Sequence, residues 1–242
     1  MAGWEGAGID EAVLIVDADV TGMDWEVLDI VEAALRDLRV EPSDDAAAVL
    51  AFDLTGTALS AQYGDIGTCY TGARVTGTMT LTAPDRPAVE RWLEGNVPLP
   101  FLIMSSSCPS DPEDAPFAPA FQRPFVAALA DVWGPGSLPY LARVMYQDLR
   151  GDWDVALGIK MEAIDAYRGF GAGSLGTEEV ASFLVGVIAA VDQTLNSEAD
   201  AAVDFRAAAR RLLLEYSDTD FGFTAEAMYE WRSWLDDWRS GG

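Results

Sequence analysis

The first fifty residues change from a continuous apolar run to helical spacing of apolar positions. Residues 12–16 are unbroken Ala-Val-Leu-Ile-Val, which is typical of a strand buried on both faces. From Asp24 the apolar positions recur every three or four residues, which predicts an amphipathic helix that ends before Glu41-Pro42. Its apolar face consists of Val27, Leu28, Val31, Ala34, Leu35 and Leu38. A second strand is expected over residues 46–54.

Residues 73–82 alternate strictly between apolar or small and polar side chains, which predicts a half-buried strand. One face carries Ala73, Val75, Gly77, Met79 and Leu81, and the other, expected to be solvated, carries Arg74, Thr76, Thr78, Thr80 and Thr82. Pro84-Asp85 then predicts the start of a short helix with Val89, Trp92 and Leu93, ended by Gly95. With a further strand at 101–104, the order is β-α-β-β-α-β, the ferredoxin-like plan.

The second half of the chain has the pattern of helices. A face of seven apolar residues follows a cap at Thr177, Ser197 caps the next helix, and a last helix begins at Thr224. Four prolines within 107–119 indicate a linker or loop. We therefore predict an α+β protein with a ferredoxin-like part over 1–107, a linker over 108–119 and a helical part over 120–242.

Composition narrows the chemistry. The 242 residues include no histidine, one lysine (Lys160) and 40 carboxylates, for a net charge of −25. Without imidazole there is no Ser-His or Cys-His nucleophile and no His-ligated metal. The acid excess suggests a halophilic protein and favours basic or neutral protein partners over nucleic acid. Cys69 and Cys108 cannot form a four-thiolate metal site. A disulfide between them is an alternative, but reduced thiols in the cytosol are the simpler expectation.

No segment has the pattern of a signal peptide or a membrane span. The N-terminal residues 1–8 lack a basic region, and the most apolar stretch, 180–191, is too short to cross a bilayer. We expect no membrane association and a cytoplasmic or virion protein.

Two aspartates follow the first strand in the sequence Asp17-Ala-Asp19-Val-Thr21. This resembles the Asp-x-Asp-x-Thr signature of the haloacid dehalogenase superfamily. The resemblance implies a Mg²⁺-dependent phosphohydrolase, with Asp17 as nucleophile and Asp19 as general acid/base. Ser105 and Lys160 would then bind phosphate, and Asp218 with Asp220 would complete the metal site. A second partial match, Asp53-Leu-Thr55, carries threonine in place of the second aspartate.

Two surfaces are candidates for binding another protein. The last helix places Met228, Trp231, Trp234, Leu235 and Trp238 on one stripe, which indicates either core or an interface rich in tryptophan. The threonine face, with Thr76, Thr78 and Thr80, is flat and polar enough to accept another surface or strand. The Gly-x-Gly-x-x-Gly sequence at 171–176 follows helical pattern and is interpreted as an interhelical turn.

These patterns favour a non-catalytic interaction or assembly protein without a cofactor, such as a viral or phage particle component or an acidic inhibitor or immunity-type protein. The partner would be a second copy or a basic protein. A Mg²⁺-dependent phosphohydrolase is the first alternative, and an inhibitor that mimics DNA is the second.

Overall fold

The computed structural model describes residues 6–20, 23–63, 67–98, 110–147, 153–170 and 175–241. The chain divides into two compact units, Met1–Trp133 and Gly134–Gly242. The first is an α+β unit built on a mixed sheet, and the second is helical. The predicted α+β class with a helical C-terminal part is therefore confirmed.

The sheet of the first unit has the strand order β2-β1-β3-β4-β5. Its strands are β1 (Glu11–Ala18), β2 (Glu41–Pro42), β3 (Val49–Tyr63), β4 (Gly67–Thr82) and β5 (Val89–Val97). β1 pairs in parallel with β2 and β3, whereas β3, β4 and β5 form an antiparallel meander. One edge of the described sheet is therefore the strand β5. The other edge is β2, but β2 has only two residues, so most of β1 also lacks a neighbour on that side.

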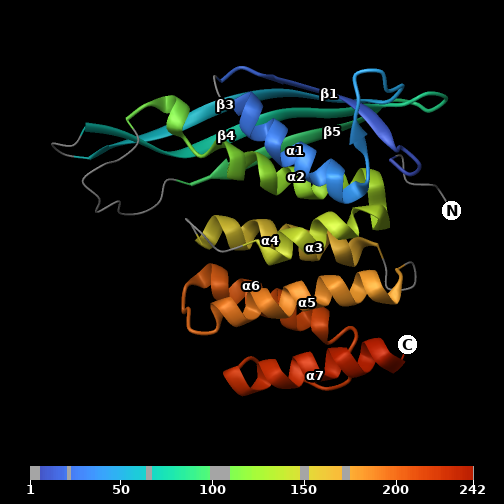
Figure 1. Ribbon diagram of the computed structural model, residues 1–242. Helices are drawn as coiled ribbons and strands as arrows, with labels where there is room; N and C mark the ends of the chain where they lie inside the picture. Colours follow the sequence, from blue (N-terminus) through green and yellow to red (C-terminus); the bar gives the residue numbers. More distant parts are fainter. Residues whose placement is uncertain are drawn as a thin grey trace. The chain divides into compact units, whose positions relative to one another are not determined.

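Both helices of this unit lie on the same face of the sheet (Figure 1). They are α1 (Met23–Leu38) and α2 (Phe117–Trp133), and a single 3-10 turn, η1 (Pro112–Asp114), precedes α2. Phe52 of β3 packs edge-on against Phe121 and Phe125 of α2, with ring centroids 5.8 Å away in each case. The alternation along β4 holds, because Ala73, Val75, Met79 and Leu81 are buried on the helical side.

A glycine and a proline allow α2 to lie unusually close to β5. Pro124 has no backbone N–H, so it cannot donate the hydrogen bond that the Ala120 carbonyl would otherwise accept within the helix. A Cβ placed on Gly95 would lie only 1.7 Å from this carbonyl oxygen. The absence of a side chain at Gly95 therefore sets how closely the helix approaches the edge strand.

The ferredoxin-like topology is not confirmed, and the helix predicted after Pro84 is wrong. Val89–Val97 is strand β5, with Leu93 and Val97 buried and Trp92 exposed. Pairing with β4 along nine residues outweighs the helical spacing of Val89, Trp92 and Leu93. β1 is also not buried on both faces, because Ile15 is 48% exposed. The strand predicted at 101–104 lies outside the described residues.

The division between the units falls after Trp133 rather than in the predicted linker at 108–119. The reason is that α2 begins within that linker, at Phe117, and buries its apolar face against the sheet. Cys69 is buried and disulfide-bonded, so the expectation of a reduced thiol is wrong at this position. Cys108 lies outside the described residues.

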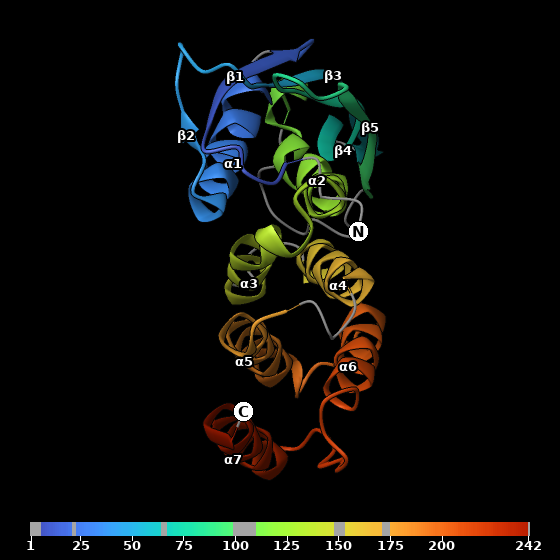
Figure 2. The same ribbon diagram turned by 90° about the vertical axis from the view of Figure 1, so that its right-hand side faces the viewer.

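The helical unit is a stack of helical hairpins arranged in two layers. Figure 2 shows α3, α5 and α7 in one layer and α4 and α6 in the other. The unit opens with the 3-10 turn η2 (Gly134–Ser137), and its helices are α3 (Leu138–Tyr146), α4 (Trp153–Gly169), α5 (Thr177–Thr194), α6 (Asp200–Leu213) and α7 (Ala225–Gly241). This is the packing of an α-solenoid, in which each helix contacts its neighbours in the stack.

The two complete hairpins are held by equivalent contacts. In α4, the buried Lys160 donates hydrogen bonds to the carbonyls of Val144, Met145 and Gln147 at the end of α3, at 2.6–2.9 Å. In α6, Arg206 donates to the carbonyls of Thr194, the last residue of α5, and of Ser197 just after it. A cation on the second helix thus binds the C-terminal carbonyls of the first helix, where the helix dipole favours positive charge.

Helix α7 is the last described helix of the stack, and its outer face is mostly polar, although Tyr229 on it is 72% exposed. Met228, Trp231 and Leu235 are buried, whereas Glu226, Glu230, Ser233 and Asp237 are exposed. Terminal elements of solenoids need such a face because they have only one neighbour. Over the described residues, no helix combines the length and apolar character needed to cross a bilayer.

Candidate functional site

The face of the sheet opposite α1 and α2 is the candidate site, and we call it the open sheet face. Side chains that alternate with the core positions of each strand form it. Its members are Ile15 and Asp17 of β1, Ala51, Asp53 and Thr55 of β3, Arg74, Thr76, Thr78 and Thr80 of β4, and Glu90, Trp92 and Glu94 of β5. The three threonines of β4 are half-buried, as expected for a solvated face.

The strand register places the charged and aromatic members in one row across the sheet. Asp17 is the partner of Asp53, Asp53 of Thr78, and Thr78 of Trp92. Trp92 is 64% exposed, at the edge of the sheet. An indole this exposed on an uncovered sheet face leaves a large apolar surface in water.

The charges on the open sheet face are mostly acidic. Arg74 forms an ion pair with Glu94 at 2.5 Å, and both side chains are about half exposed. In contrast, no hydrogen bond or ion pair involves the side chains of Asp17, Asp53 or Glu90 within the described parts of the chain. The face therefore presents three carboxylates that have no partner in the described parts of the chain, together with an exposed indole at its edge.

Asp19 has a structural role at the end of β1. Its carboxylate accepts a 2.7 Å hydrogen bond from the Gly56 N–H, and its own N–H donates to the Leu54 carbonyl. The side chain thus continues the β1–β3 ladder beyond the last residue of β1. Ser105, the serine proposed to bind phosphate, lies outside the described residues.

The other residues of the phosphohydrolase hypothesis lie in the helical unit, where Lys160 and Asp220 have partners. Lys160 is 1% exposed, and three carbonyls accept hydrogen bonds from its Nζ. Asp220 is paired with Arg210, and Asp218 is exposed. In the described part of the chain, no three acidic or cysteine side chains lie close enough together to hold a metal ion. Lys160 and Asp220 are therefore already engaged within the helical unit.

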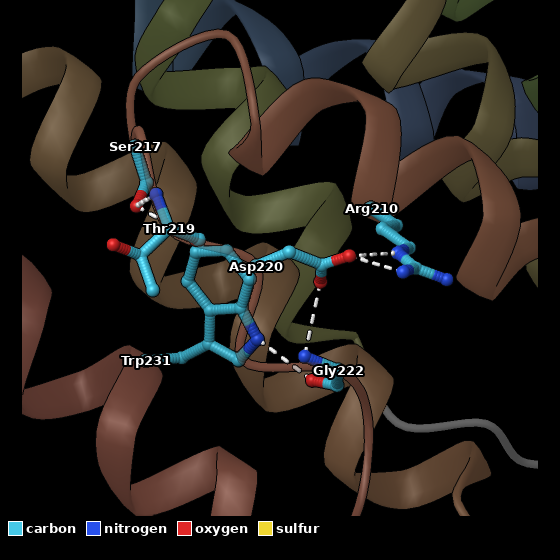
Figure 3. A network of polar contacts seen from close by, with 6 residues as sticks. All are labelled: Arg210, Ser217, Thr219, Asp220, Gly222 and Trp231. Atoms are coloured by element: carbon cyan, nitrogen blue, oxygen red, sulfur yellow. Dashed lines mark hydrogen bonds and ion pairs between the residues drawn. The ribbon is translucent and has the colours of Figure 1, made fainter.

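Figure 3 shows the network that occupies Asp220 in the connection between α6 and α7. Arg210 donates to Asp220, and the Gly222 N–H donates to the same carboxylate at 3.0 Å. Gly222 has a φ of +72°, and its carbonyl accepts from the Trp231 indole at 2.9 Å. Hydrogen bonds to Arg210 and Gly222 lower the pKa of Asp220. This network fixes the start of α7 and points to no ligand.

The tryptophan stripe of α7 belongs mainly to the core of the helical unit. Met228, Trp231 and Leu235 are at most 3% exposed, which favours the core over an interface for these three residues. The physical reason is that α7 buries this face on α5. Trp234 and Trp238 are half-buried, and Trp238 contacts the Tyr216 ring edge-on at 5.9 Å. Burial raises the pKa of the Tyr167 hydroxyl, which lies 2.5 Å from that of Tyr216.

Sequence reasoning found the threonines of the open sheet face but missed its aromatic residue. Trp92 was assigned to a helix together with Leu93, although the two residues point to opposite faces of β5. The signal that indicates a strand with Trp92 on the open face is the alternation of two sets of side chains. One set is Glu90, Trp92, Glu94 and Asn96, and the other is Leu93, Gly95 and Val97.

Comparison of the chain with family models, with curated proteins and with solved structures finds no match.

Proposed function

We propose that this protein is a non-catalytic interaction or assembly protein that docks another protein on the open sheet face. The observation that supports the proposal is Trp92, a largely exposed indole in the centre of β5, on the sheet face opposite the two described helices of its unit, α1 and α2. Tryptophan is enriched among the residues that dominate binding energy. Flat sheet faces with β-branched side chains suit contact with a second surface.

The helical unit is consistent with this role. Stacked helical hairpins serve as extended binding scaffolds in many proteins, because each added hairpin lengthens the surface without changing the core. We place the protein in the cytoplasm or in a viral particle, where it would act as an assembly component or as an acidic inhibitor.

Site-specific photocrosslinking tests the proposal. A benzophenone amino acid at Thr55, which is exposed on the open sheet face, should give a discrete crosslink to a protein in the cells or particles that contain this chain. The same group at Ser233, exposed on α7, serves as the matched control and should not. Trp92→Ala should strongly reduce the crosslink at Thr55. Equal crosslinking at both positions would contradict a specific surface.

A phosphatase assay addresses the alternative. We expect no release of phosphate from an aryl phosphate in the presence of Mg²⁺. Phosphate release that Asp17→Asn abolishes, with folding unchanged, would replace the proposal with a phosphohydrolase.

A further inference from the structure

The charges on the open sheet face are mostly acidic, and three of the carboxylates are uncompensated within the described parts of the chain. Asp17, Asp53 and Glu90 have no partner in the described parts of the chain, and Arg74, the basic side chain on the face, is already paired with Glu94. The opposite face differs, because Arg91 is paired there with Asp131 of α2. A partner that covers the open sheet face must therefore supply positive charge or leave carboxylates desolvated and unpaired.

The register adds a specific argument at Asp17 and Asp53. These two residues are direct partners in the parallel pair of β1 and β3, so their side chains project from neighbouring positions. Like charges at directly opposed positions destabilise a sheet pair. A cationic group bound between them would remove this repulsion. Binding would then be more favourable by the repulsion energy between Asp17 and Asp53 in the unbound protein.

Trp92 provides a second attraction for the same chemistry. On the open side of β5 it lies between Glu90 and Glu94, two positions away along the strand in each direction. The face of an indole attracts an ammonium or guanidinium group, and flanking carboxylates strengthen that preference. Thr78 separates Trp92 from Asp53 in the cross-strand row, so the row offers two separate cation positions.

We propose that the open sheet face binds a basic protein surface, with an arginine or lysine side chain of the partner over Trp92 and a second cationic side chain beside Asp17 and Asp53. The proposal rests on the proposed function and adds the chemical class of the partner to it. The partner is a protein, because two separated cationic side chains must be presented together across a flat, threonine-lined surface.

A calorimetric titration tests this proposal on the full chain. The probe is a peptide in which arginine and threonine alternate, and the comparison peptide carries glutamate in place of arginine. The arginine peptide should bind, the glutamate peptide should not, and Trp92→Ala should weaken binding by about tenfold. Trp25→Ala is the matched control, because Trp25 is 59% exposed but lies on α1. Its affinity should match that of the original protein.

The carboxylates are tested with a paired substitution. Asp17→Asn combined with Asp53→Asn should weaken binding of the arginine peptide, whereas Asp204→Asn with Glu198→Gln, two exposed acids of the helical unit, should not. Equal affinity for all four variants would mean general attraction to an acidic protein and would overturn the proposal.

Different results would overturn the docking function and the basic character of the partner. A protein crosslinked at Thr55 that is acidic, together with no binding of the arginine peptide, would overturn the basic partner and leave the docking function in place. A crosslink to a second copy of this chain would have the same effect, because an acidic copy cannot supply the positive charge. Binding of the arginine peptide without any crosslink at Thr55 would instead remove the docking function.

Discussion

Gly95 shows at the scale of one residue how the helical layer is positioned on the sheet. The carbonyl that Pro124 leaves without its helical partner occupies the space where a side chain of residue 95 would be. Because the neighbouring atom belongs to the backbone of α2, a methyl group cannot be accommodated by a change of rotamer.

Gly95→Ala should therefore destabilise the protein. We expect a loss of about 1–3 kcal/mol, the usual cost of overpacking, measured by urea denaturation. Gly169→Ala is the matched control, because a Cβ at Gly169 would have no neighbour within 4 Å. Its free energy of unfolding should stay within about 0.5 kcal/mol of the original. Equal effects of both substitutions would contradict the close approach of α2.

The spacing of apolar residues predicted which side chains are buried where the strand alternation was clear. It predicted burial poorly for the aromatic residues. Alternation along β4 correctly separated Val75 and Met79 from Thr76 and Thr78. Helical spacing placed Met228, Trp231 and Leu235 on one stripe of α7 but could not tell whether the same chain covers them. That depends on α5, which no local pattern positions.

At the scale of elements, the connection between α6 and α7 should be sensitive to pH. The Arg210 hydrogen bond, followed by that of Gly222, lowers the pKa of Asp220 from its usual 3.8. Since the folded-state pKa lies below the unfolded one, the stabilisation is present above about pH 4 and is lost as the pH falls through the lowered pKa.

Asp220→Asn tests this dependence. The urea midpoint of the variant should lie below that of the original protein at pH 6–7, and the difference should shrink below about pH 4. Asp218→Asn, an exposed neighbour, should leave the midpoint unchanged at both values. A difference independent of pH would show that the charge of Asp220 does not contribute.

Helix α7 should be required for folding of the helical unit. Deletion of residues 224–242 removes the buried Met228, Trp231 and Leu235 and exposes the face of α5 that they cover. We expect loss of the cooperative unfolding transition of this unit in calorimetry. Deletion of residues 240–242 alone should preserve it. A cooperatively folded remainder that no longer associates would instead assign α7 to an interface.

The element predictions succeeded where the apolar spacing was clear, as in α1, α5 and α7. The expected caps at Thr177 and Ser197 are wrong, because Gly176 is the N-cap of α5 and Ala199 is the N-cap of α6, neither with a side-chain cap hydrogen bond. At Thr224 the expected cap is present, because its hydroxyl accepts from the Ala227 N–H. The segment at Val89–Val97 failed because its spacing fits both a helix and a strand, and only pairing with β4 decides between them.

At the scale of the whole molecule, stability should depend on salt. Forty carboxylates against fifteen basic side chains repel one another over long distances. The Debye length falls from about 30 Å at 0.01 M salt to about 3 Å at 1 M. The melting temperature should therefore rise with KCl over this range. An unchanged melting temperature would remove the argument for adaptation to high salt.

The two-layer stacking of hairpins was not visible in the sequence, which shows no internal repeat. The equivalent contacts use Lys160 in one hairpin and Arg206 in the next, with different neighbours in sequence. The two hairpins therefore share a contact and not a sequence pattern. In each one a cationic side chain of the second helix binds the carbonyls at the end of the first helix, α3 or α5.

The burial of Lys160 has a consequence for labelling chemistry. It is the only lysine in the sequence, and it is enclosed in the helical unit. An amine-reactive reagent should therefore reach this side chain only when the unit opens. The rate of labelling at Lys160, located by mass spectrometry and separated from the N-terminal amine, would report local unfolding of the helical unit without an introduced probe, and it equals the opening rate when labelling outpaces reclosing.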